Sequence, residues 1–126
     1  PNLRQVHLIH AELFDELKRT GYSVTPGLLG ENITTKGIDL LNLPQRTLLK
    51  IGNTAEVEIT GLRNPCDQLN SIKEGLMNAV LEKGENSQLI QKAGIMSVVH
   101  KGGHIFPGDV IQVNLPPKPH LPLSKV

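Results

Sequence analysis

Aromatic side chains and an excess of either charge are what this sequence lacks most. Its 126 residues include one Tyr, two Phe and no Trp, and 13 Lys and Arg stand against 12 Asp and Glu. Proteins that hold single-stranded nucleic acid stack bases on several aromatic rings, and duplex binders need a clustered basic face. Nucleic acid is therefore not expected as a partner.

Cysteine and long apolar runs are also scarce. Cys66 is the single cysteine, which excludes an internal disulfide. The most apolar stretches, such as residues 93–99, are far shorter than the roughly 18 residues that span a bilayer. No basic segment followed by an apolar run opens the sequence, so no secretory signal is indicated. These absences predict a cytoplasmic protein with no membrane partner.

Turn formers are abundant, and they separate short apolar segments. Twelve glycines and nine prolines divide a chain of 13.8 kDa that is 38% hydrophobic, enough for one core. Apolar residues at helical spacing from Leu13 to Leu17 predict one amphipathic helix that stops at Gly21, and a weaker helix is predicted over residues 67–81. Strands are predicted at residues 6–9, 33–35, 47–51, 55–60, 94–100 and 109–115, the last two as antiparallel neighbours.

Many short strands with few helices predict a β-dominated fold, a small mixed barrel. Four prolines then crowd residues 116–126, and a segment without amide hydrogens cannot join a central strand. We therefore divide the chain into a domain over residues 1–115 and a proline-rich tail over residues 116–126 that lies extended on the surface.

The histidines do not form an evident metal site. His7 and His10 are three apart on a predicted strand and so point to opposite faces. His100 and His104 flank a Gly-Gly turn, but no Cys or carboxylate accompanies them at metal-site spacing. The sequence also contains no phosphate-binding glycine loop and no nucleophile elbow.

Cys66 is the strongest candidate for chemistry. It follows an Asn-Pro turn, precedes a predicted helix start and lies three residues after Arg63, and each of these features lowers the pKa of a thiol. A thiolate there would be both a nucleophile and a soft metal ligand. The alternative is that Cys66 is a small apolar residue that fills a gap under the helix.

A second candidate is the pair Glu31-Asn32, which follows the glycine-rich turn of residues 26–30. Asn32 could bind a ligand through its amide or hydrogen-bond the backbone of its own turn. Glu31 could act as a base or be a solvated carboxylate.

The order of four motifs resembles the MOSC domain, named for the C-terminal part of molybdenum-cofactor sulfurases. The motifs are Pro-Gly-Leu-Leu-Gly-Glu-Asn-Ile at residues 26–33, Gly-Ile-Asp-Leu at 37–40, Leu-Arg-Asn-Pro-Cys at 62–66 and Gly-Gly-His-Ile-Phe-Pro-Gly-Asp at 102–109. The resemblance covers nearly the whole chain, with its single cysteine in the expected motif.

The resemblance implies a MOSC-type β-barrel with a few short peripheral helices and a pocket for the molybdenum cofactor, a pterin whose dithiolene holds the metal. Cys66 matches the family cysteine, regarded as the metal ligand in MOSC reductases and as a sulfur carrier in the sulfurase branch. Glu31, Asn32, Arg63 and Asn64 match residues beside the pocket. The planar fork of Arg63 could hold a phosphate or a pterin oxygen, or form a salt bridge at the barrel rim.

The sequence departs from the family at its start. MOSC domains usually begin with further strands and a glycine-rich loop, and nothing before Pro1 supplies them. The expected consequence is an exposed sheet edge, through which a second copy of the chain could pair to give a homo-oligomer.

Three functions follow as hypotheses. The first is a molybdenum-cofactor-dependent reductase of small N-hydroxylated or N-oxygenated compounds, which would need an electron-donor protein. The second is a sulfur carrier that bears a persulfide on Cys66 and has a cysteine desulfurase as partner. The third is a cofactor-free binding module. Pyridoxal phosphate enters only by family association, because no lysine lies in a motif that demands it.

Overall fold

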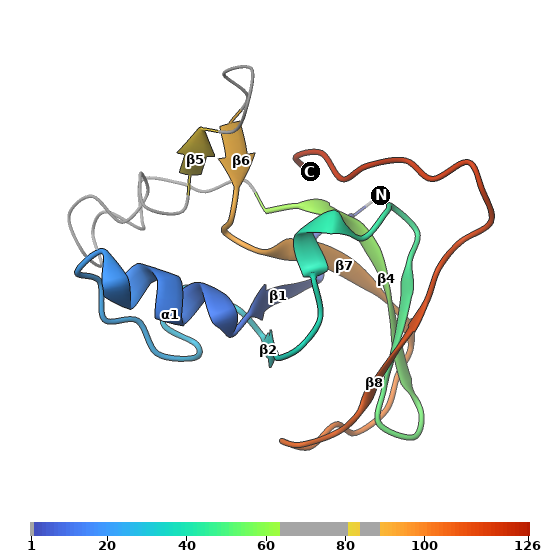
Figure 1. The fold of residues 1–126 in the computed structure, drawn as a ribbon. Helices are drawn as coiled ribbons and strands as arrows, with labels where there is room; N and C mark the ends of the chain where they lie inside the picture. The colour runs from blue at the N-terminus through green and yellow to red at the C-terminus, as the bar shows by residue number, and fades with distance from the viewer. Residues whose placement is uncertain (1, 64–80, 84–88) are drawn as a thin grey trace.

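The structure is a computed structural model that describes residues 2–63, 81–83 and 89–126 (Figure 1). Its elements in chain order are β1 (Val6–His10), α1 (Glu12–Arg19), β2 (Ile33–Thr35), the short 3₁₀ helix η1 (Leu40–Asn42), β3 (Leu48–Ile51), β4 (Ala55–Leu62), β5 (Leu81–Lys83), β6 (Leu89–Gln91), β7 (Ile95–Lys101) and β8 (Ile111–Asn114).

Six of these strands form one curled sheet in the order β2-β1-β7-β4-β3-β8, and β5 and β6 form a separate antiparallel pair (Figure 1). Within the six-stranded sheet β1 and β2 run parallel, and the other neighbours are antiparallel. The predicted β-dominated, barrel-like fold with few short helices is confirmed.

Buried side chains gather on the two faces of this sheet. One group, the barrel cluster, lies inside the curl and includes Leu8, Leu49 and Ile59. The other, the helix cluster, packs α1 and the following loop against β1 through Ile9, Leu13, Leu17, Leu29 and Ala93. Successive strand residues point to opposite faces, so Leu8 and Ile9 of β1 contribute to different clusters.

The helix forms where its apolar spacing predicts. Leu13 and Leu17 are one turn apart, so both face β1 and are at most 1% exposed. Glu12 and Asp15 lie in the first turn, and Lys18 and Arg19 in the last, which suits the helix dipole.

One predicted pairing is wrong. The segments at residues 94–100 and 109–115 were expected to be antiparallel neighbours, but β7 pairs with β1 and β4, whereas β8 pairs with β3. The β3–β4 hairpin lies between them. β7 and β8 are three strand spacings apart, which is roughly 14 Å. The nine residues at 102–110 can span about 30 Å when extended, so they are long enough to cross the end of the β3–β4 hairpin. The glycines and proline in this segment therefore belong to a crossing connection and not to a tight hairpin turn.

The proline-rich segment of residues 116–126 lies outside the six-stranded sheet and is mostly exposed, as predicted. It returns to β4 at its end, where the Leu62 N–H donates to the Ser124 carbonyl at 2.8 Å and the Val126 N–H donates to the Leu62 carbonyl at 3.2 Å. These bonds bring the last residues of the chain beside the start of the Arg63 motif.

The predicted weak helix at residues 67–81 lies outside the described residues up to residue 80, and Leu81 begins β5. Among the described helices, none has the length and apolar character that crossing a membrane requires.

Candidate cofactor-binding site

The loop between α1 and β2 ends in a tight turn with two glycines. The Leu28 N–H donates to the Thr25 carbonyl at 3.1 Å, and the Gly30 N–H donates to the Gly27 carbonyl at 3.0 Å. Gly27 and Gly30 have φ values of 89° and 85°, which a Cβ would disfavour. Leu29, 2% exposed, anchors this turn in the helix cluster.

Asn32 fixes the end of the turn to β1. Its N–H donates to the His7 carbonyl at 2.9 Å, and its side-chain Oδ1 accepts the His7 N–H at 2.8 Å. Asn32 therefore bonds a distant strand rather than its own turn. This reciprocal pair extends the parallel β1–β2 ladder by one residue and places Glu31 against β1.

Arg63 fixes the same turn from the end of β4. Its backbone N–H donates to the Gly94 carbonyl at 3.0 Å, and its Nη1 donates to the Leu29 carbonyl at 2.8 Å. A guanidinium carries five N–H donors. Arg63 is half-buried. It thus connects the end of β4 both to the segment before β7 and to the glycine turn.

His7 lies at the centre of this arrangement. It is 5% exposed, and its Nε2 donates to the Ala93 carbonyl at 2.7 Å. Burial lowers the pKa of His7 below its ordinary value of 6.5, and the nearby Arg63 charge lowers it further, while the Glu31 charge opposes both effects. His7 is therefore neutral at neutral pH and adds no charge to the site.

Gly94 makes this close packing possible. Its φ is 98°, and a Cβ there would lie 2.7 Å from the His7 Nε2 and would collide with the Leu8 carbonyl. No other residue type allows the segment before β7 to approach β1 so closely.

Glu31 is the unsatisfied member of the site. It is 8% exposed, and its Oε1 has no hydrogen-bond partner, while its Oε2 meets the Thr34 hydroxyl only at 3.5 Å. A buried carboxylate oxygen without a donor is unfavourable, and buried polar atoms in folded proteins are nearly always paired. The position therefore suits a ligand that brings N–H or O–H donors.

The structure brings together three of the residues singled out from the sequence, Glu31, Asn32 and Arg63. Asn64 and Cys66 lie outside the described residues. His7 was weighed in the sequence only as a metal ligand, and its role here depends on the contact with Ala93, which is 86 residues away.

His10, on the other side of β1, has a different environment. Its Nδ1 is buried without a partner, and burial lowers its pKa below 6.5. A surface pocket of about 270 Å³ lies beside it, lined also by Glu12, Gly37, Ile38 and Asp39. The part of the chain that the structure describes contains no group of three His, Cys, Asp or Glu residues arranged to hold a metal ion.

Comparison with known proteins identifies the family of this chain. The family model of the MOSC domain matches residues 1–112. The chain belongs to the MOSC domain family.

Among solved structures, the chain is similar to YiiM from Geobacillus stearothermophilus, with a TM-score of 0.73, 24% identity and 88% of this chain covered. It is also similar to YiiM from Escherichia coli, with a TM-score of 0.72, 18% identity and 94% covered. YuaD from Bacillus subtilis follows with a TM-score of 0.67, 22% identity and 89% covered. At these identities the likeness shows the fold. No curated protein sequence matches the chain.

The chain spans 54% of the length of the Geobacillus structure, 58% of the Escherichia structure and 64% of the Bacillus structure.

Proposed function

We propose that the chain binds the molybdenum cofactor beside Glu31 and Arg63 and reduces small N-hydroxylated or N-oxygenated compounds. The observation that carries the proposal is the buried Glu31 Oε1 without a donor, in a member of the MOSC domain family.

The two side chains complement the two chemical ends of this cofactor. Its pterin carries ring and amino N–H groups, which a carboxylate such as Glu31 accepts. Its phosphate and ring oxygens are acceptors, which a guanidinium binds through charge-assisted hydrogen bonds. A carboxylate and a guanidinium whose charges both act on the buried, neutral His7 thus suit a ligand that carries both N–H donors and an anion.

The remaining residues of the site hold these groups in position. Asn32 and Arg63 fix the glycine turn to β1 and β4, and Leu29 anchors that turn in the helix cluster. His7 stays neutral, so it neither repels Arg63 nor neutralises Glu31. Because these contacts exist without a ligand, little ordering is needed when one binds.

Cys66 follows Arg63 by three residues and is the proposed metal ligand, since a soft thiolate suits a metal already held by sulfur. When bound, the cofactor supplies a redox-active metal that accepts oxygen from the substrate. These 126 residues contain one cysteine, too few to ligate an iron–sulfur cluster, and an electron-donor protein is the proposed source of electrons.

The molybdenum content of protein purified from a host that makes the cofactor tests this proposal. Wild type should contain near-stoichiometric metal, Cys66→Ala little, and Glu31→Gln less than wild type, because the amide offers a donor where the site needs an acceptor. Asp15→Asn, an exposed change of the same kind on α1, is the control and should match wild type. Equal metal in all four proteins, or none in wild type, contradicts the proposal.

Mass spectrometry of the same samples separates the reductase from the sulfur carrier. Added sulfur on Cys66 after incubation with a cysteine desulfurase, in protein that holds no molybdenum, would support the carrier function instead. Reduction of an N-hydroxylated substrate with an artificial electron donor, lost in Cys66→Ala, supports the reductase.

A further inference from the structure

One end of the curled sheet contains a hollow with aliphatic walls, which we call the barrel mouth. Its volume is about 200 Å³. β1, β2 and β4 begin at this end of the sheet, and β3 and β7 finish there. Each of these five strands contributes one aliphatic side chain to the walls, namely Ile33 of β2, Val6 of β1, Val99 of β7, Val57 of β4 and Ile51 of β3.

The mouth continues the barrel cluster toward solvent. Ile51, Ala55 and Val57 belong to that cluster and also line the mouth. Val57 and Val99 are direct partners across β4 and β7, so their side chains share one face of the sheet. Ile105, from the segment that follows β7, completes the aliphatic wall.

Apolar surface at the mouth remains in contact with water. Val99 is 52% exposed and Ile105 is 40% exposed, although both side chains are aliphatic. Among the described residues that line the mouth, only Lys101 has a side chain with a polar atom. A buried water needs two to four polar partners, which aliphatic side chains do not offer, whereas an apolar ligand gains by covering them.

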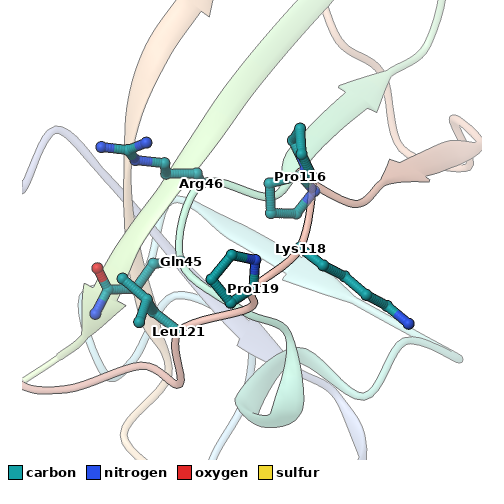
Figure 2. A pocket seen from close by; sticks show the side chains of 7 residues that line it. Gln45, Arg46, Pro116, Lys118, Pro119 and Leu121 are labelled. Atoms are coloured by element: carbon teal, nitrogen blue, oxygen red, sulfur yellow. The ribbon is translucent and has the colours of Figure 1, made fainter.

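The sheet itself fixes the walls of the mouth. Ladders of hydrogen bonds join its five strands to one another, so the side chains are in place before a ligand arrives. A larger hollow of about 390 Å³ beneath the proline-rich segment has one wall outside the sheet. Figure 2 shows Arg46 and Lys118 there pointing away from the rings of Pro116 and Pro119, so neither cation is aimed into that hollow.

We propose that the barrel mouth binds a small uncharged molecule with an aromatic or branched aliphatic body. Cavities of about 150 Å³ with aliphatic walls accept a benzene ring, so the volume of the mouth suits a ring with a few further carbons. Aliphatic side chains offer no partner to an ionised group, which would lose its hydration there. Seven aliphatic side chains are far fewer than the roughly 20–30 residues that each partner contributes to a stable protein interface, so a small molecule fits the mouth better than a second protein.

Titration of the full chain with toluene, followed by NMR of the methyl groups of Ile51, Val57 and Val99, tests the proposal. Saturable shifts confined to residues of the mouth are expected. Benzylammonium and benzoate carry the same ring with a charge of either sign, and each should bind at least about tenfold more weakly than toluene because the charge loses hydration. The absence of saturable shifts with toluene, or binding of either ion as tight as that of toluene, would overturn the proposal.

Substitutions in the walls test the position of the ligand. Ala55→Leu adds three carbons inside the mouth and should weaken toluene binding at least about tenfold by filling it. Val99→Asn places an amide in the wall and should weaken toluene binding about fivefold or more. Val98→Asn makes the same change on the opposite face of β7 and should bind toluene as wild type does.

The pair at residues 98 and 99 decides the outcome even where Ala55→Leu fails to fold, because Val99 is half-exposed and tolerates a polar side chain. Equal toluene binding in Val99→Asn and Val98→Asn, or unchanged binding in a folded Ala55→Leu protein, would contradict a ligand in the mouth.

Discussion

Two irregular segments of this molecule are held to the sheet by opposite means. The glycine turn before β2 is tied to β1 and β4 by the side chains of Asn32 and Arg63, and its Leu29 is 2% exposed. The proline-rich segment is tied mainly through its own carbonyls, and its Leu121 is 57% exposed. Packing against the core therefore fixes the shape of the glycine turn, whereas the proline rings fix much of the backbone shape of the proline-rich segment.

The largest loss of stability should come from filling the space that Gly94 leaves beside β1. Gly94→Ala introduces a Cβ against the Leu8 carbonyl and His7 at a φ of 98°. Strain and overpacking together should lower the free energy of unfolding by about 4 kcal/mol, measured by denaturant titration.

Gly102→Ala is the control for this change. An added Cβ at Gly102 meets nothing within 4 Å, so its stability should equal that of wild type. A Gly94→Ala protein as stable as Gly102→Ala would contradict the packing described for the site.

A pair of leucine truncations compares the two segments directly. Leu29→Ala leaves a cavity in the helix cluster and should lower the free energy of unfolding by about 3 kcal/mol. Leu121→Ala removes an exposed side chain and should change it by less than about 0.5 kcal/mol. Equal losses in the two variants would show that the proline-rich segment is also fixed by the core.

The pH dependence of stability reports on the buried histidines of β1. The pKa of His7 is lowered by burial, so below pH 6.5 the unfolded chain binds a proton that the folded chain does not. The free energy of unfolding should therefore fall as pH drops below 6.5, by up to about 1.4 kcal/mol per pH unit for one group, until the lowered pKa is reached. His10, whose pKa is lowered in the same direction, adds to this loss.

Unfolding measured at several pH values in His7→Gln isolates the contribution of His7. The slope below pH 6.5 should become shallower in this variant than in wild type. An unchanged slope in His7→Gln would contradict a buried neutral His7.

Among the changes to the glycine turn and its contacts, the smallest loss of stability should come from the hydrogen bond between the turn and β1. Asn32→Ala leaves the partly buried His7 N–H without its acceptor and should lower the free energy of unfolding by about 1 kcal/mol. Asn32→Asp keeps an acceptor oxygen, so it should recover most of that loss. A loss of the same size in both variants would point to the Asn32 amide nitrogen instead.

Much of this fold can be predicted from local patterns. The alternation of Val57 and Ile59 with Glu56 and Glu58 predicts β4, and Leu13 with Leu17 predicts α1. The neighbours of β7 could not be predicted, because β1 and β7 meet over about 90 residues and no local signal records that contact. The turn residues at 102–108 indicate where the chain bends, but they do not identify the strand with which the next segment pairs.

The site shows the same division. The glycine turn with Glu31 and Asn32 is visible as a motif, and Arg63 belongs to another. Their proximity depends on Gly94 and His7, whose sequence neighbours carry no functional signal. Asn32 hydrogen-bonds a distant strand and not its own turn, and this pairing arises only in the folded chain.

The position of β7 between β1 and β4 also determines how long one edge of β1 remains unpaired during synthesis. Residues 6–10 are synthesised well before β7, so the β1 edge that pairs with residues 95–97 stays unpaired until residue 97 has been added. At 5–20 residues per second this interval is roughly 5–20 s, far longer than the microseconds in which a hairpin such as β3–β4 forms. For that period this edge of β1 remains open to backbone pairing, the state in which a chaperone or a second nascent chain can bind it.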